Sequence, residues 1–501
     1  MSTIKEANGG GWLSRSRTVA KPGFNRWMVP PAALCVHLCI GQVYAFSVFN
    51  KPLSLLHGVV QTPEGGTPTL VPGADDWSIA TLGWIFSIAI LFLGLAAAFG
   101  GAWVEKVGPR KTMATAAALF GGGFIVAALG VWSHQLWLVY LGYGVLGGCG
   151  LGLGYISPVK TLMSWFPDRP GMATGMAIMG FGGGAFIASP LSVYLMKLFA
   201  TPAADGSTVM IQGVAGAFVV LGVVYFIYML VGATIVRVPP PGWAPEGYVA
   251  PTTSRGMVTT ANVHVDEALR TPQFWLLWGV LFLNVTAGIG VLGQASLMIQ
   301  EMFPPVTGAD GLVTGGVTAA AAAGFVGLLS LFNMLGRFFW ASTSDYIGRK
   351  TTYMIFFLLG IALYAAVPTT GSMGSIVLFV LFYGIILSMY GGGFATIPAY
   401  LKDVFGTQFV GAIHGRLLTA WSAAGIVGPV LVNYIRQYQL DSGVSKADAY
   451  TVTMYIMAAL LAVGFVLNFL MRPVDSKHHM KAVTDTAPGG TAGQPIRTAR
   501  A

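Results

Sequence analysis

Charged residues are scarce in this sequence, and cysteines are fewer still. Of its 501 residues, 9% are charged and 55% are hydrophobic, whereas soluble proteins carry roughly 25% charged residues. The three cysteines, Cys35, Cys39 and Cys149, lie in apolar segments without metal-ligand spacing, which argues against a disulfide framework or a metal site. The sequence also lacks an ATPase motif and a nucleophile with a neighbouring base. It therefore predicts neither an enzyme nor a cofactor-dependent protein.

Long apolar segments are what the sequence has instead. Each spans about 20 residues, which is enough to cross a bilayer core of about 30 Å. Twelve such segments are predicted, centred near residues 38, 90, 122, 148, 184, 222, 284, 326, 360, 386, 424 and 460. We therefore expect an all-α, multi-pass membrane protein that has the lipid bilayer as its solvent.

Basic residues outnumber acidic ones, which gives a formal net charge of +9. If both termini lie in the cytoplasm, about 21 of the 27 Lys and Arg residues fall on cytoplasmic segments, which is the positive-inside asymmetry. Four fall outside, namely Lys51, Lys197, Arg436 and Lys446, and two fall within helices. The basic excess therefore reflects topology and not binding to nucleic acid. It predicts a protein of the inner (plasma) membrane with both termini in the cytoplasm.

The sequence repeats at a fixed offset of 240 residues. "EKVGPRK" matches "DYIGRKT", which pairs Glu105 with Asp345 and Gly108 with Gly348. "YGVLGGCGLGLGYISP" matches "YGIILSMYGGGFATIP", and "PGMATG" matches "VGAIHG". Duplicated halves of six helices, with a substrate site between them near the bilayer midplane, are typical of secondary transporters. The predicted fold is therefore twelve transmembrane helices in two pseudo-symmetric six-helix bundles.

A proline-rich stretch, "VPPPGWAPEGYVAPTTSRG", separates the two halves and indicates a linker. The predicted parts are a cytoplasmic N-terminal arm (1–26), an N-terminal bundle (27–236), a cytoplasmic linker (237–271), a C-terminal bundle (272–472) and a disordered cytoplasmic tail (473–501). Glycine-rich runs at 147–154, 180–184 and 391–393 lie inside apolar helices and lack the Gly-Lys-Ser/Thr ending of a phosphate loop. They are expected to let helices approach closely.

Two copies of a charged loop, "GAWVEKVGPRK" and "WASTSDYIGRK", resemble the loop that members of the major facilitator superfamily carry between helices 2 and 3 and again between helices 8 and 9. The family pattern is Gly-x-x-x-Asp-x-x-Gly-x-Arg/Lys. In the first copy Glu105 replaces the Asp, and in the second copy Ala341 replaces the first Gly. The resemblance implies a cytoplasmic latch, in which the carboxylate pairs with basic residues or a helix N-terminus. A plain tight turn with flanking charges is the alternative. The expected gating residues are Glu105, Arg110, Lys111, Asp345, Arg349 and Lys350.

A narrower resemblance covers most of the chain. "GQVYAFSVF", "SWFPDRPGMATG", "LRTPQFWLLW" and the segment from Asn333 to Arg337 are similar to the oxalate/formate antiporter family, a relative of the monocarboxylate transporters. The resemblance implies the major facilitator fold and the transport of a small carboxylate without a cofactor. It leaves the identity of that carboxylate open.

Arg337 lies inside the eighth predicted helix. It precedes Asp345, at the cytoplasmic end, by eight residues, which places it about 12 Å deeper in the membrane. Its repeat partner is Ala97, so the repeated fold does not require a charge here. An arginine at the bilayer centre costs about 2.5–3.5 kcal/mol on insertion scales, and no Asp or Glu lies centrally in a predicted helix to neutralise it. We predict that Arg337 binds the substrate carboxylate; the alternative is a structural arginine that bonds backbone carbonyls or snorkels to the cytoplasm.

Asn333 lies one helical turn before Arg337 and shares its face. In many monocarboxylate transporters, the position that resembles Asn333 holds an Asp that can carry a proton. Because Asn333 is neutral, this proton relay is in doubt here. Asn333 is expected to orient the guanidinium, or else to make a simple interhelical hydrogen bond. The remaining candidates for substrate contact, each of which could serve helix packing instead, are Gln42, Tyr44, Tyr155, Tyr390, Phe394, Trp421 and Ser422.

The eleventh predicted helix departs from the family pattern. The resemblance implies that the oxalate transporter of this family uses two cations, a Lys on helix 11 and the Arg on helix 8, one for each carboxylate. In the matching region of this sequence, Trp421 or Ser422 stands instead of the Lys. His414 and Arg416 precede them, closer to the cytoplasmic mouth. Arg416 is either a vestibule charge or a snorkelling residue. His414, and His37 in the first helix, are either proton sites or neutral core histidines.

These features together predict a secondary active transporter of small organic anions that works by alternating access. A single central cation favours a monocarboxylate such as formate, lactate or pyruvate, because a dicarboxylate would leave one buried charge without a partner. Two alternatives stay open: oxalate/formate exchange with Arg416 as the second cation, and a membrane sensor built on a transporter scaffold. A co-transported proton or a counter-anion would couple the cycle, and a monomer is expected.

Overall fold

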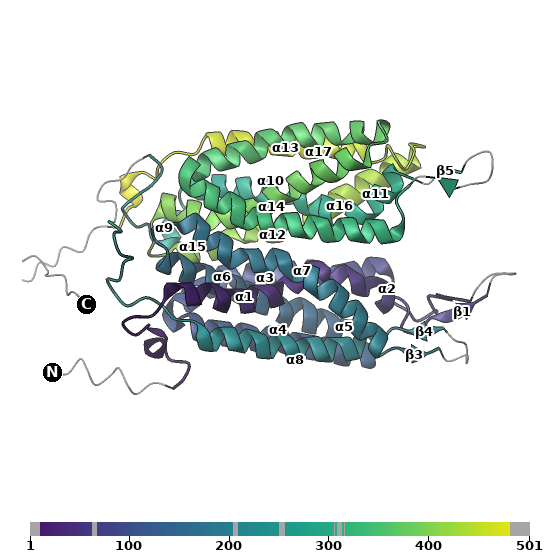
Figure 1. Cartoon of the computed structure of the whole chain (residues 1–501), viewed down its shortest axis with the longest axis horizontal. Helices are drawn as coiled ribbons and strands as arrows, with labels where there is room; N and C mark the ends of the chain where they lie inside the picture. The colour runs from purple at the N-terminus through teal and green to yellow at the C-terminus, as the bar shows by residue number, and fades with distance from the viewer. Residues whose placement is uncertain are drawn as a thin grey trace, which may run out of the picture.

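Long helices dominate the computed structural model of this protein, which describes residues 11–62, 68–203, 209–249, 256–304, 306–307, 313–314 and 316–480 (Figure 1). Over these residues, twelve helices are long and apolar enough to cross a membrane. Each of the twelve contains the centre of one predicted apolar segment. The prediction of twelve transmembrane helices is therefore confirmed.

The first half of the chain forms one bundle (Figure 1). Its helical elements are η2 (Arg15–Thr18), η3 (Arg26–Met28), α1 (Val29–Ile40), η4 (Gly41–Phe49), α2 (Asn50–Leu53), α3 (Ile79–Val107), α4 (Pro109–Trp132), α5 (Leu136–Val139), η5 (Tyr140–Gly147), α6 (Gly148–Trp165), α7 (Pro170–Leu198) and α8 (Val214–Ile235). Two antiparallel hairpins pair β1 (Val59–Gln61) with β2 (Thr69–Val71) and β3 (Thr201–Pro202) with β4 (Met210–Ile211).

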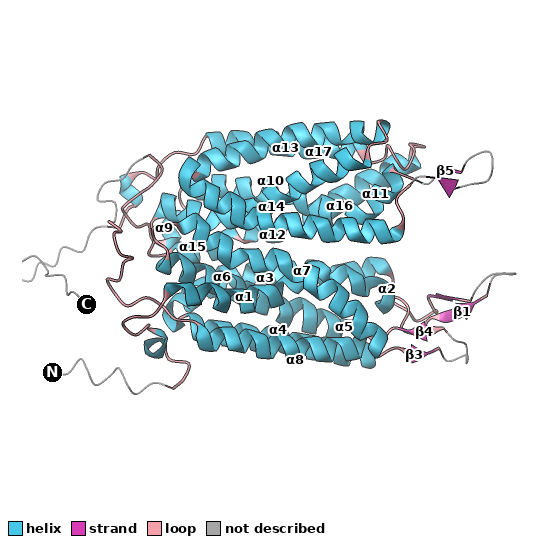
Figure 2. Ribbon diagram, in the orientation of Figure 1, coloured by secondary structure: helices cyan, strands magenta, loops and turns pink. Residues whose placement is uncertain are grey.

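The second half forms the other bundle, in the green and yellow part of Figure 1. Its helical elements are α9 (Val265–Ala268), α10 (Pro272–Leu292), α11 (Ala295–Met302), α12 (Ala319–Ile347), α13 (Arg349–Ser372), α14 (Ile376–Phe405), α15 (Val410–Leu417), α16 (Thr419–Asp441), α17 (Thr451–Phe469) and η6 (Ser476–His478). One short hairpin pairs β5 (Val306–Thr307) with β6 (Val313–Thr314). Figure 2 shows that helices make up nearly all of the molecule between its two ends.

The two bundles repeat in structure at the offset that the sequence predicts. Helix α12 begins and ends 240 residues after α3, and α13 does so after α4. Ser78 and Thr318 cap the starts of α3 and α12, and each side chain accepts a hydrogen bond from a backbone N–H at 3.2 Å. Gly108 and Gly348 end the same helices with φ of 82° and 86°, a conformation that favours glycine. The same capping residues and glycines therefore start and end these helices at equivalent positions in the two bundles.

The described ends of the chain, with η2, η6 and α9, lie on one side of the molecule, which we call the terminal side (Figure 1). The three β-hairpins lie on the opposite side, which we call the hairpin side. On the terminal side, a Cβ atom on Gly171 of α7 would lie 2.1 Å from the backbone oxygen of Ala341 in α12. A Cβ on Gly415 of α15 would lie 2.1 Å from the backbone oxygen of Ala97 in α3. The helix backbones therefore touch, and the two bundles are closed together on this side.

The end of the linker contacts both the second bundle and the described part of the tail, and the Val263 N–H donates to the backbone oxygen of Phe405 in α14 at 3.0 Å. Val263 and His479 form an isolated bridge, and the Met480 N–H donates to the backbone oxygen of Asn262 at 2.8 Å. Residues 473–480, which were assigned to the tail, include η6, whereas 481–501 lie outside the described residues. The domain boundaries and the disordered tail therefore stay predictions.

Candidate functional site

Arg337 lies in α12 where that helix meets the other bundle. Its Nε donates to Oδ1 of Asn333 at 2.9 Å, one turn earlier on the same helix. Its Nη1 donates to the backbone oxygen of Ile178 on α7 at 3.4 Å. The side chain is fully buried. A cation of the second bundle therefore reaches the backbone of the first.

The guanidinium of Arg337 has no carboxylate partner in the part of the chain that the structure describes. Its Nη2 also lacks a hydrogen-bond partner among those residues. The rings of Phe181 and Phe394 each lie 5.4 Å from its Cζ, and cation–π attraction offsets part of the cost of burial. A buried charge without a counter-ion still costs several kcal/mol. The site is therefore suited to an anion that supplies the opposite charge.

Aromatic rings from both bundles surround this guanidinium. Phe394 of α14 lies 4.5 Å from Trp421 of α16 and 5.3 Å from Tyr390, measured between ring centroids. The hydroxyls of Tyr44 and Tyr390 are 3.0 Å apart and connect η4 to α14. Tyr155 of α6 lies 5.4 Å from Trp421. These five residues, all named from the sequence, lie together and form most of an aromatic cage.

Phe181 of α7 completes this aromatic cage, and sequence reasoning did not single it out. Its ring lies 5.3 Å from that of Trp421 and 5.6 Å from that of Tyr155. The available signal was the glycine-rich run around it, because a Cβ on Gly182 would lie 3.0 Å from Nε of Arg337. The glycines permit close helix approach, as expected, and so bring Phe181 to the cation.

Two polar residues of the first bundle lie deeper in that bundle. Gln42 accepts a hydrogen bond from the Tyr143 hydroxyl at 2.9 Å, which occupies its Oε1 within the first bundle. His37 stacks on Tyr155 with the ring centroids 5.4 Å apart, and its Nε2 lies 3.2 Å from the Tyr155 backbone oxygen. The structure therefore places His37 directly behind the cage and Gln42 away from it.

The candidate residues at the start of the eleventh transmembrane helix point in different directions. Trp421 belongs to the cage, whereas the Ser422 hydroxyl donates to the backbone oxygen of Ile90 in α3 at 2.7 Å. His414 is buried with its ring 5.9 Å from that of Tyr155. Arg416 lies 3.4 Å from Asp266 of α9 and is partly exposed. Arg416 is therefore held by the linker and not directed into the cage.

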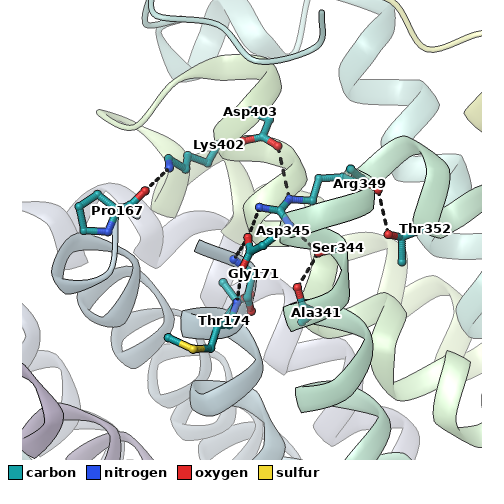
Figure 3. Close-up of polar contacts among 12 residues, drawn as sticks. Pro167, Gly171, Thr174, Ala341, Ser344, Asp345, Arg349, Thr352, Lys402 and Asp403 are labelled. Atoms are coloured by element: carbon teal, nitrogen blue, oxygen red, sulfur yellow. Dashed lines mark hydrogen bonds and ion pairs between the residues drawn. The ribbon is translucent and has the colours of Figure 1, made fainter. Parts of the chain in front are cut away.

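Asp345, at the end of α12, connects the bundles on the terminal side (Figure 3). Its carboxylate oxygens accept from the backbone N–H groups of Gly171 and Met172 at 2.8 Å each. These groups begin α7, where the helix dipole favours a negative charge. Arg349 lies 2.5 Å from the same carboxylate and 3.4 Å from Asp403. The second loop therefore has the contacts that a latch needs, while its gating role stays a prediction.

Glu105, the repeat partner of Asp345, makes a weaker connection. It pairs with Lys160 at 2.7 Å, and the two side chains are 16% and 28% exposed. A Cβ on Gly411, at the start of α15, would lie 3.3 Å from the Glu105 carboxylate. The first carboxylate thus faces the equivalent helix start, and its described ion-pair partner lies within its own bundle.

The remaining basic residues of the two loops have roles inside their own bundles. Arg110 donates from Nε to the backbone oxygen of Ala233, at the end of α8, at 3.1 Å. Lys350 donates to the backbone oxygens of Phe469 and Met471 at 2.8 and 2.9 Å. Basic side chains at helix C-termini stabilise the exposed carbonyls. Lys111 is exposed on the terminal side.

Two six-helix bundles, closed together on one side around a buried cation, define the protein as a membrane transporter. The sequence matches the model of the Major Facilitator Superfamily over residues 33–429 and 325–497, and the chain belongs to that superfamily. Among solved structures, the Escherichia coli fucose:proton symporter FucP is similar with a TM-score of 0.59 and 15% identity, covering 89% of this chain and 99% of FucP. The proton:xylose symporter XylE gives a TM-score of 0.61 at 14% identity, covering 89% and 95%. These structures share the fold.

Curated relatives extend over nearly the whole chain. It is 27% identical over 459 residues to the oxalate:formate antiporter of Oxalobacter formigenes, covering 90% of this chain and 93% of the relative. It is 24% identical over 505 residues to apicoplast pyruvate carrier 1 of Toxoplasma gondii, covering 89% and 88%. The resemblance to the oxalate/formate antiporter family is confirmed.

Proposed function

We propose that this chain is a secondary active transporter that carries a small organic anion, most favourably a monocarboxylate such as formate, lactate or pyruvate. The observation that carries this proposal is the buried Arg337, whose guanidinium has no carboxylate partner among the described residues. A substrate carboxylate would supply the missing charge, and the planar guanidinium suits bidentate binding of a carboxylate. The names of the relatives, which include oxalate, formate and pyruvate, are consistent with this substrate class.

In the proposed cycle, the terminal side faces the cytoplasm of the plasma membrane. Opening this side would break the two hydrogen bonds from α7 to Asp345 and separate the glycine contacts of α7 with α12 and of α15 with α3. The anion would bridge the bundles through Arg337 in place of the contact with Ile178. A co-transported proton or an exchanged anion would provide the driving gradient.

Exchange of oxalate for formate is the second candidate. It is favoured by the match to the oxalate:formate antiporter over 93% of that protein. A dicarboxylate would need a second positive charge, and Arg416 would have to leave Asp266, which is 3.4 Å away, to supply it. The monocarboxylate proposal needs no such rearrangement.

Uptake of labelled lactate into proteoliposomes that contain the purified protein tests these proposals. Formate and unlabelled lactate should compete at concentrations at least about tenfold below those of oxalate, because the second charge of oxalate would be buried without a partner. Arg337→Ala should abolish uptake while the protein still elutes as a folded species. If oxalate competes best, exchange replaces the monocarboxylate proposal. Uptake at the wild-type rate by Arg337→Ala would reject an Arg337-dependent carrier altogether.

A further inference from the structure

Three arginines, Arg17, Arg110 and Arg237, meet at the end of α8 on the terminal side, and we call them the arginine cluster. Nη2 of Arg110 and Nη1 of Arg237 share one acceptor, the backbone oxygen of Thr234, at 3.5 and 2.7 Å. The charges of Arg237 and Arg17 both act on the guanidinium of Arg110. None of the three pairs with a carboxylate in the part of the chain that the structure describes. Like charges this close repel one another, so the cluster attracts an anion.

The end of α8 neutralises only part of this charge. The carbonyl end of a helix carries about half of an elementary negative charge, whereas the arginine cluster carries three positive charges. Arg110 is 4% exposed, and its donors bond to backbone oxygens around it. Arg237 is partly exposed and donates through Nη1 to the carbonyls at the helix end. Arg17 is exposed, so Arg17 and Arg237 are the members that a ligand can reach.

The N-terminal arm brings Arg17 to this place. The Val238 N–H donates to the backbone oxygen of Thr18 at 2.9 Å, so the arm runs beside the chain that follows α8. Residues 11–28 contain four basic residues and no acidic one. The arm therefore adds positive charge to the helix end and supplies no counter-ion for it.

Apolar side chains of the arm border the arginine cluster. Trp12 and Leu13 are 44% and 38% exposed, and the Trp12 ring lies 5.5 Å from Cζ of Arg110. Arg110 is in the first turn of α4 and Thr234 in the last turn of α8, so the cluster lies where two membrane-spanning helices end. Tryptophan prefers this interface between membrane and water, and basic segments there attract anionic lipids. The surface thus combines cations for a phosphate with an apolar border for acyl chains.

We propose that Arg17, Arg110 and Arg237 bind the headgroup phosphate of an anionic phospholipid in the leaflet on the terminal side, with Trp12 and Leu13 against its acyl chains. Guanidinium groups bind phosphate oxygens through paired N–H donors. Phosphatidylcholine also has a phosphate, but its own cation leaves the charge of the cluster unbalanced. A free phosphate ion has no chains to cover Trp12 and Leu13. The proposal goes beyond transport, because it concerns a lipid that binds at the edge of the first bundle and is not carried.

Native mass spectrometry of the delipidated full chain in detergent measures this binding. The protein is titrated separately with dioleoylphosphatidylglycerol, dioleoylphosphatidylcholine and inorganic phosphate. Phosphatidylglycerol should bind at least about tenfold more tightly than phosphatidylcholine, because three arginines act on one net negative charge. Arg17→Gln should weaken the binding of phosphatidylglycerol about fivefold and leave that of phosphatidylcholine unchanged. Arg237→Gln is the second variant and should have an effect in the same direction.

Two control variants remove one exposed positive charge elsewhere. Lys197→Gln lies on the hairpin side, and Arg472→Gln lies on the terminal side of the second bundle. Both should keep the affinity for phosphatidylglycerol within about twofold of the wild type. If phosphatidylglycerol and phosphatidylcholine bind the wild type equally, the proposal is wrong. An effect of Arg472→Gln as large as that of Arg17→Gln would mean diffuse attraction without a site, and displacement of phosphatidylglycerol by inorganic phosphate would assign the cluster to a soluble anion instead.

Discussion

The two bundles have equivalent helices but carry their charged groups at different positions. At equivalent positions of α3 and α12 stand Ala97, which packs against Gly415, and Arg337, which reaches Ile178 of the other bundle. The ends of these helices carry Glu105 and Asp345. The helix ends are set by capping residues and glycines that are present in both copies of the repeat. The positive charge that is proposed to bind the substrate, Arg337, is present in one copy only. The comparison teaches that the repeat builds the scaffold and that its asymmetry carries the proposed function.

The two loop carboxylates differ in the same way. Asp345 joins the other bundle through two backbone N–H groups, and its pair with Arg349 is buried, with side chains 9% and 6% exposed. Glu105 pairs with Lys160 inside one bundle, and these side chains are more exposed, at 16% and 28%. Exposed ion pairs contribute about 0–1 kcal/mol, whereas breaking a buried one costs about 3–5 kcal/mol. The second loop should therefore dominate closure of the terminal side.

The largest effect is expected at the charge that breaks the symmetry. Arg337→Lys should reduce lactate uptake about a hundredfold, which corresponds to about 2.7 kcal/mol. Lysine keeps the positive charge, but it lacks the planar set of N–H donors with which arginine can bind Asn333 and a carboxylate at the same time. Initial uptake rates in proteoliposomes provide the measurement. Arg472→Lys, at an exposed position, serves as the control, and equal rates for the two variants would mean that only charge matters at Arg337.

The next largest effect is expected at the backbone contact between the bundles. Gly415→Val should lower uptake about tenfold, because its side chain would meet the Ala97 backbone oxygen. Spin labels at Lys106 and Tyr346, the repeat-related ends of α3 and α12, should move apart. Gly324→Val is the control, since nothing lies within 4 Å of a Cβ there. An unchanged label distance in Gly415→Val would show that this contact does not hold the side closed.

Asp345→Asn should slow turnover about tenfold while the half-saturating lactate concentration changes by about twofold or less. Removal of the charge weakens the contacts with Arg349 and with the start of α7, but Asp345 is about 12 Å from Arg337 along the helix axis. Uptake rates over a range of lactate concentrations separate the two quantities. A loss of affinity with turnover preserved would place Asp345 in binding and not in gating.

The smallest effect is expected from Glu105→Gln, which should slow turnover about twofold or less, because its pair with Lys160 is solvent-accessible. The comparison with Asp345→Asn is made in the same uptake assay. Equal effects of the two variants would mean that both loops act as latches of the same strength.

The sequence by itself determined the scaffold. Apolar length located the twelve helices that are long enough to cross a membrane among the described residues, and the repeat at 240 residues matches the bounds of α3 with α12 and of α4 with α13. It also indicated that Arg337 is buried and shares a helix face with Asn333. These properties could be predicted because they depend on hydrophobicity, capping residues and helical spacing, which act within one segment.

Only the tertiary structure decided which side chains meet across the two bundles. Trp421 and Ser422 are adjacent in sequence, yet one faces the aromatic cage and the other donates to Ile90 of α3. Phe181 reaches Arg337 because glycines let α7 approach α12, and Arg416 turns to Asp266 of the linker. Successive residues on a helix point about 100° apart. The rotation of each helix about its own axis therefore determines which of its side chains face the aromatic cage. That rotation is set by packing between segments distant in the chain.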